Sequence, residues 1–72
     1  MSETVDARGL SCPQPVMMTM DTMKKMLRGE IVVLVDTQAS RENVSRAAQS
    51  QGWEVREVRK DGDEFHLYIA RE

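Results

Sequence analysis

Cysteine is almost absent from this chain of 72 residues, which contains a single one, Cys12. One cysteine excludes an intramolecular disulfide, and it excludes the multiple cysteines of Cys-X-X-Cys redox centres and structural zinc sites. Proline is nearly as rare, and both prolines, Pro13 and Pro15, follow the cysteine closely. The chain therefore concentrates its one thiol and its two rigid residues in one short segment.

Long apolar runs and an excess of positive charge are also missing. No stretch approaches the ~18–20 apolar residues that a membrane span requires. The first residues, MSETVDA, lack the basic start and apolar run of a secretory signal, so we expect a cytoplasmic protein. Twelve acidic residues against ten basic ones give a net charge of −2, which argues against nucleic acid as a partner. The length predicts one domain, residues 1–72.

The first half of the sequence predicts a strand, a helix and a second strand. TVDA (4–7) is a short strand candidate. Over residues 13–28, apolar residues recur at steps of four, three and four, which predicts an amphipathic helix that stops at Gly29. The predicted apolar stripe consists of Val16, Met20, Met23 and Leu27. The unbroken apolar run in EIVVLVD (30–36) predicts a central strand with little solvent on either face.

The second half predicts a helix and a hairpin. Ser40 is the predicted cap of a helix over 41–51, which ends at Gly52. The strand over 53–60 loses its alternation at Val58, which indicates a bulge or an exposed strand end. Asp-Gly at 61–62 is a two-residue hairpin signal, and a cleanly alternating strand follows it.

The predicted order is therefore β-α-β-α-β-β, an α+β two-layer sandwich. The first crossover makes the first two strands parallel, and the hairpin adds an antiparallel pair. Two amphipathic helices would cover one face of a four-stranded mixed sheet, and the other face would be partly open.

The position of Cys12 before two prolines suggests a chemical role. Proline is favoured at the first helical position, so Pro13 there would make Cys12 the N-terminal cap. The positive end of the helix dipole would then lower the pKa of its thiol moderately below the usual value of about 8.5. Pro15 has no N–H, which leaves Gln14 as the predicted donor to the sulfur. Pro13, Gln14 and Pro15 would thus shape the site; the alternative is that Cys12 is a small buried apolar residue.

Methionine and histidine are the other residue types that could serve a function. The methionines of the first helix are predicted mainly as core residues, with Met17 or Met18 exposed beside the thiol. His66 stands alone, with no cysteine or carboxylate set to complete a ligand sphere. We therefore expect neither a metal nor a cofactor.

The segment DARGLSCPQPV (6–16) resembles the signature of the TusA-like sulfur-carrier family. In that family a short strand and a Gly-Leu pair precede Cys-Pro-X-Pro at the start of the first helix. The second half, SRENVSRAAQSQGWEVREV (40–58), is similar to the YedF-type branch, which is linked to sulfur or selenium metabolism. One departure is VDTQAS (35–40), where the branch that serves transfer-RNA thiolation typically has a doubled aspartate.

The resemblance implies a two-layer sandwich similar to the C-terminal domain of the third bacterial translation initiation factor. It also implies that Cys12 takes up sulfane sulfur as a persulfide and passes it to an acceptor protein, with Pro13 and Pro15 as the motif prolines. The expected partners are sulfur-donor and sulfur-acceptor proteins, and the chain is expected to be a monomeric carrier rather than a stand-alone enzyme. The alternative is a regulatory or scaffolding module in which Cys12 is structural or redox-sensing. RNA binding is a weaker alternative, because it rests on fold analogy alone.

Overall fold

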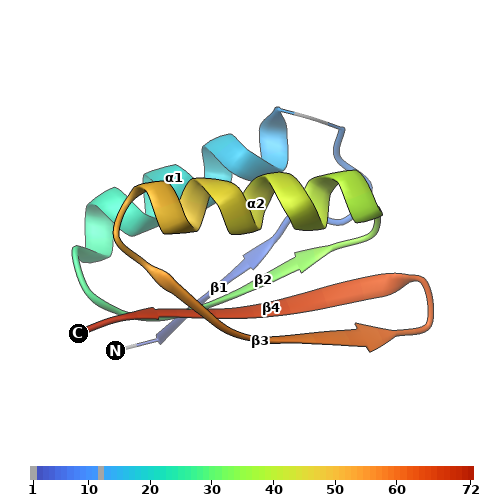
Figure 1. The fold of residues 1–72 in the computed structure, drawn as a ribbon. Helices are drawn as coiled ribbons and strands as arrows, with labels where there is room; N and C mark the ends of the chain where they lie inside the picture. The colour runs from blue at the N-terminus through green and yellow to red at the C-terminus, as the bar shows by residue number, and fades with distance from the viewer. Residues whose placement is uncertain (1, 12) are drawn as a thin grey trace.

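The computed structural model describes residues 2–11 and 13–72. Its elements follow the predicted order β-α-β-α-β-β (Figure 1). They are β1 (Ser2–Asp6), α1 (Gln14–Met26), β2 (Gly29–Val35), α2 (Gln38–Ser50), β3 (Glu54–Asp61) and β4 (Glu64–Arg71).

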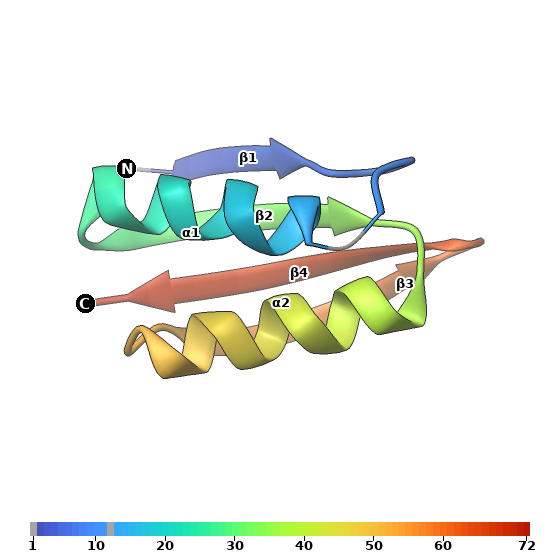
Figure 2. The same ribbon diagram turned by 90° about the horizontal axis from the view of Figure 1, so that it is seen from above.

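The strands form one mixed sheet in the order β1-β2-β4-β3. β1 and β2 are parallel, and β4 is antiparallel to both of its neighbours. Both helices lie on the same face of the sheet, α1 over β1 and β2 and α2 over β3 and β4 (Figure 2). The predicted α+β two-layer fold is therefore confirmed.

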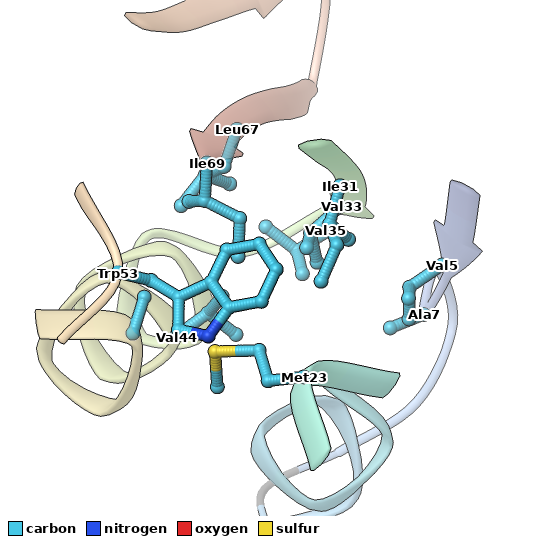
Figure 3. Packing of buried hydrophobic residues seen from close by; sticks show 11 residues of the cluster. Val5, Ala7, Met23, Ile31, Val33, Val35, Val44, Trp53, Leu67 and Ile69 are labelled. Carbon is cyan, nitrogen blue, oxygen red and sulfur yellow. The ribbon is translucent and has the colours of Figure 1, made fainter. Parts of the chain in front are cut away.

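The core fills the space between the helices and the sheet. The central strands contribute alternate residues to it, because successive side chains of a strand point to opposite faces. Figure 3 shows the ring of Trp53 in this core, with the sulfur of Met23 from α1 facing it. The buried strand residues in the core include Val5, Ile31, Val33, Val35, Leu67 and Ile69.

The buried face of α1 differs from the predicted stripe. Its buried residues are Pro15, Thr19 and Met23, whereas Leu27 is 68% exposed. Thr19 tolerates burial because its hydroxyl donates a hydrogen bond to the carbonyl of Pro15 at 2.8 Å. The rest of the predicted stripe, Val16 and Met20, is partly buried against the core.

The end of α1 was also predicted wrongly. The helix stops at Met26 rather than at Arg28, and Leu27 takes a positive φ of 65°. The N–H of Arg28 then donates to the carbonyl of Met26 at 2.7 Å, which closes a three-residue γ-turn. Gly29 is consequently the first residue of β2 and not the helix stop.

Helix α2 begins one turn earlier than predicted. Its cap is Thr37, whose hydroxyl accepts a hydrogen bond from the N–H of Ser40 at 3.1 Å. Ser40 is therefore inside the first turn, where it is buried. The predicted stop is confirmed: Gly52 has a φ of 81°, and the N–H of Trp53 donates to the carbonyl of Ala48 at 2.9 Å in a Schellman arrangement.

The hairpin has the predicted bulge, with its loop shifted by one residue. The register between β3 and β4 shifts between Val55 and Glu57, which explains why Val58 falls out of phase. Asp61 pairs with Glu64, so the loop consists of Gly62 and Asp63 rather than of Asp61 and Gly62. Gly62 supplies the positive φ, 63°, at the first loop position, where type II′ turns take glycine.

The sheet face opposite the helices is partly covered by its own long side chains. Val32, Leu34 and Tyr68 lie on this face and are half-buried. The guanidinium of Arg59 sits over the Tyr68 ring, 5.6 Å from its centroid, and an ion pair with Glu57 holds it. Across residues 2–11 and 13–72, none of the helices has the length and apolar character to cross a membrane.

Candidate functional site

The segment that leads to the motif is a tight turn at the end of β1. The N–H of Leu10 donates to the carbonyl of Ala7 in a long contact of 3.4 Å, and Gly9, the third residue of the turn, has a φ of 77°. A positive φ at that position is the pattern of a type II turn, which favours glycine there. The RGL segment is therefore bent back on itself before the chain reaches Ser11.

This turn is anchored to the sheet by backbone and side-chain hydrogen bonds. The N–H of Ala7 donates to the carbonyl of Leu34 at 2.9 Å, which extends the β1–β2 ladder by one step. The N–H of Gly9 donates to Oδ2 of Asp36 at 2.7 Å. The carboxyl ends of two parallel strands meet at the same edge, and this places Asp36, directly after β2, beside the segment that follows β1.

Arg8 connects the turn to the far hairpin. Its Nη2 lies 2.8 Å from Oδ2 of Asp6, and its Nη1 lies 3.2 Å from Oε2 of Glu64. The hydrogen bonds from Arg8 lower the pKa of Asp6 to about 2, and the same partners raise the pKa of Arg8. The guanidinium of Arg8 is thus engaged by these two carboxylates.

The start of α1 lies one residue later than predicted. Pro13 occupies the N-cap position, with φ −97° and ψ 14°, and its carbonyl accepts from the N–H of Met17 at 3.0 Å. The N–H of Gln14 donates to the carbonyl of Ser11 at 3.0 Å. The placement of Cys12 as the N-cap was therefore wrong, and the amide predicted to serve its sulfur is already engaged by a backbone carbonyl.

Cys12 itself lies outside the described residues, so its predicted exposure and lowered pKa stay predictions. Its neighbours in the chain, Ser11 and Pro13, are both exposed. Gln14 is exposed as well, whereas the ring of Pro15 is fully buried. The two motif prolines thus have different surroundings, and only Pro15 ties the start of α1 to the core.

Two open hollows lie on either side of this segment. The first, of about 450 Å³, lies between the turn and the start of α2, and Ser11 and Asp36 contribute to its walls. The second, of about 460 Å³, lies between α1 and α2 and is lined by Pro13, Val16, Asn43, Arg46, Ala47 and Ser50. Met17 and Met18 are 58% and 36% exposed on α1, which agrees with the prediction for these methionines.

Charge is distributed unequally between the two layers. The helices with their flanking residues, 13–28 and 37–52, carry five basic and two acidic side chains, a net charge of +3. The remaining residues carry five basic and ten acidic side chains, a net charge of −5. The two parts together give the net charge of −2 of the chain. The helix layer is therefore basic overall, with Lys24, Lys25 and Arg28 at the end of α1 away from the motif and Arg41 and Arg46 on α2.

The predicted absence of a metal site rests on the sequence. Within the described part of the chain, no three His, Asp or Glu side chains gather in a way that would hold a metal ion. Nε2 of His66 lies 3.4 Å from Oε1 of Glu64, which is the same carboxylate group that contacts Arg8.

Sequence reasoning missed the anchors of the turn. Asp36 is 27 residues from Gly9 and Glu64 is 56 residues from Arg8, so no local pattern pairs them. One available signal was topological: an aspartate directly after the second strand of a parallel pair lies at the edge where the first strand also ends.

The chain is thus a small two-layer α+β sandwich in which Cys-Pro-X-Pro leads into the first turn of the first helix. The family described as "Sulfurtransferase TusA" matches residues 3–71, and the chain belongs to this family. A "Putative sulfur carrier protein" of Archaeoglobus fulgidus is 34% identical over 68 residues, covering 93% of this chain and 93% of that protein. Proteins named YedF, from Escherichia coli, and TusA, from Allochromatium vinosum, are each 29% identical to the chain.

The fold is also similar to that of a crystal structure. A SirA-like protein of Desulfitobacterium hafniense superimposes with a TM-score of 0.86 at 31% identity, covering 94% of this chain and 95% of that one. A relative of Aquifex aeolicus with the name "Putative sulfur carrier protein" is 39% identical over 69 residues. This chain spans 35% of the length of that relative, so the domain also occurs within longer proteins.

Proposed function

We propose that this protein is a sulfur carrier that holds sulfane sulfur as a persulfide on Cys12 and passes it to an acceptor protein. The observation that carries the proposal is membership of the TusA family over residues 3–71, with the chain's only cysteine in the family motif. The exposed neighbours Ser11 and Pro13 support access to this position by another protein.

The chemistry requires one thiolate and no change in net oxidation state. The Cys12 thiolate attacks the outer sulfur of a donor persulfide, a new S–S bond forms, and the donor thiolate leaves as the old S–S bond breaks. In the second step an acceptor thiolate attacks the outer sulfur on Cys12, and the Cys12 thiolate leaves. A second cysteine in the chain would attack the inner sulfur, expel the outer one and form a disulfide, so a single cysteine suits a carrier.

The partners are donor and acceptor proteins that dock on the helix side. The basic layer favours an acidic partner surface, because complementary charge speeds the encounter of two proteins. The hollow between α1 and α2, together with exposed Met17, offers apolar surface beside Arg46. We expect the protein to act in the cytoplasm, where reduced thiols persist.

The test is to incubate the protein with a persulfide-loaded sulfurtransferase and to measure the intact mass. Wild type should gain the mass of one sulfur atom, and dithiothreitol should remove it. This reversal matters because two oxygen atoms in a sulfinic acid have nearly the same mass but resist the reductant. Cys12→Ser should gain nothing.

A displaced thiol is the matched control. The double variant Ser11→Cys/Cys12→Ser keeps one thiol in the same segment and should load much more slowly. Failure of wild type to gain sulfur, together with a thiol that reacts with iodoacetamide only after unfolding, would contradict the proposal and favour a structural Cys12.

A further inference from the structure

Asp36 joins the turn before the motif to the junction between β2 and α2. Its Oδ2 accepts from the N–H of Gly9 at 2.7 Å, across 27 residues of sequence. The distance is that of a short, charge-assisted hydrogen bond, the stronger kind in proteins. Asp36 is itself held in place, because it lies between the last residue of β2 and Thr37, the cap of α2.

Two N–H groups of this turn donate to side chains outside it: that of Arg8 to Oδ1 of Asp6 at 3.2 Å, and that of Gly9 to Oδ2 of Asp36 at 2.7 Å. The turn uses the carbonyl of Ala7 and the N–H of Leu10, and the N–H of the third residue plays no part in closing a β-turn. The Asp36 carboxylate takes up this N–H. It therefore fixes the orientation of the peptide unit that lies three residues before the thiol.

The other anchor of the turn consists of two ion pairs at the surface. The ion pairs of Arg8 with Asp6 and Glu64 are each about half exposed, so water and salt weaken them. Asp36 also forms a wall of the hollow that the turn faces, together with Ser11 and Ser40. The Asp36 contact is thus the short hydrogen bond that ties the Gly9 amide to the end of β2.

We propose that Asp36 is a positioning residue that holds the turn so that Cys12 meets a partner's persulfide in a reactive geometry. This inference rests on the proposed function, because it concerns the transfer between Cys12 and another protein. A small reagent can approach the thiol from any direction, whereas a docked protein presents its persulfide to the thiol from one fixed direction. Loss of the anchor should therefore slow transfer from a protein more than reaction with a small molecule.

The experiment compares Asp36→Ala and Asp36→Asn with wild type. Asp36→Ala removes the acceptor, and loading by a persulfide-loaded sulfurtransferase should slow by about 3–10-fold, the population shift expected from one lost hydrogen bond. The side-chain carbonyl of asparagine can still accept from Gly9, so Asp36→Asn should load within about twofold of wild type. Asp63→Ala removes a carboxylate from the hairpin loop and should leave loading unchanged.

Two further readouts separate positioning from general damage. The rate of alkylation by iodoacetamide, measured well above the thiol pKa, should be equal in all four proteins. Hydrogen exchange of the Gly9 amide should be faster in Asp36→Ala and close to wild type in Asp36→Asn. Circular dichroism should show that every variant is folded.

Several results would overturn the inference. One is an Asp36→Ala variant with an unchanged loading rate or an unchanged exchange rate of the Gly9 amide. Another is an Asp36→Asn variant that loads as slowly as Asp36→Ala, because the charge of Asp36 rather than its hydrogen bond would then matter. Absence of any sulfur on wild-type Cys12 is a different result. It would remove the proposed function, while the exchange of the Gly9 amide would still report whether Asp36 anchors the turn.

Discussion

Helices α1 and α2 have the same length, 13 residues, and lie on the same face of the sheet, but their ends are built differently. α2 begins with a hydroxyl cap, Thr37, and ends at Gly52 in a Schellman arrangement. Among the described residues, no side chain caps α1, whose N-cap residue is Pro13 and whose C-cap residue is Leu27, with a positive φ. The start of α1 is thus fixed by two prolines and its end by a γ-turn. The start of α2 is instead fixed by a side-chain cap, and its end by a glycine.

The sharpest test of this difference removes the buried ring at the start of α1. Pro15→Ala should lower the free energy of unfolding by about 2 kcal/mol, because two buried methylenes are lost and the unfolded chain gains freedom. Pro13→Ala, at an exposed position, should change it by less than about 0.5 kcal/mol. Urea unfolding followed by circular dichroism measures both, and equal losses would show that the two prolines do not differ.

The corresponding change at α2 removes its hydroxyl cap. Thr37→Ala should cost about 1 kcal/mol of stability, because the N–H of Ser40 loses its acceptor. Thr37→Ser should retain most of it. Thr22→Ala is the matched control in α1: its hydroxyl donates only to the carbonyl of Met18, within the helix, and alanine favours the helix. A larger loss for Thr22→Ala than for Thr37→Ala would remove the contrast between the helices.

The end of α1 offers a gain in stability. Leu27→Gly should raise the free energy of unfolding by about 0.5 kcal/mol, since relief of the positive φ outweighs the added freedom of the unfolded chain. Leu27→Ala keeps the Cβ atom and should give no gain. Thermal unfolding of the two variants decides the point, and a loss in Leu27→Gly would mean that the exposed leucine side chain contributes more than its backbone costs.

The smallest effect concerns the ion pairs in the turn before α1. The pKa of Asp6 is lowered to about 2 in the folded protein, against about 3.9 for an unperturbed aspartate. The pairing with Arg8 therefore stabilises the fold above about pH 4, and this contribution disappears as the pH falls through about 2. Arg8→Ala should return the Asp6 pKa to its ordinary range in an NMR titration. Arg56→Ala, which removes an arginine paired with Glu54 and Glu72, should leave it lowered.

Local signals explain how much of the fold was predictable. Gly52, the alternation in β4 and the phase slip at Val58 each reflect backbone preferences that act within a few residues, and each has its expected place in the structure. The start of α2 was missed because Thr37 and Ser40 are both good caps, and sequence alone does not choose between them. The choice follows from strand pairing: β2 ends at Val35 opposite Phe65, which leaves Thr37 as the first residue free to cap.

The candidate site was less predictable than the fold. The motif identified Cys12, Pro13 and Pro15, but it did not show that Pro15 is buried and Pro13 exposed. That difference depends on which side of α1 faces the sheet. The side that contains Thr19 can be buried because its hydroxyl donates a hydrogen bond to the carbonyl of Pro15 within the helix. The contacts of Gly9 with Asp36 and of Arg8 with Glu64 join distant segments, so they appear only once the strands are paired.

The chain's only tryptophan, Trp53, is 3% exposed at the point where α2 meets the sheet, and Met23 of α1 faces its ring. Its indole emission is consequently a built-in optical probe of the contact between both helices and the sheet. Stopped-flow fluorescence can therefore time the docking of the two layers during refolding without any dye, and without attaching a label to the single thiol of the chain.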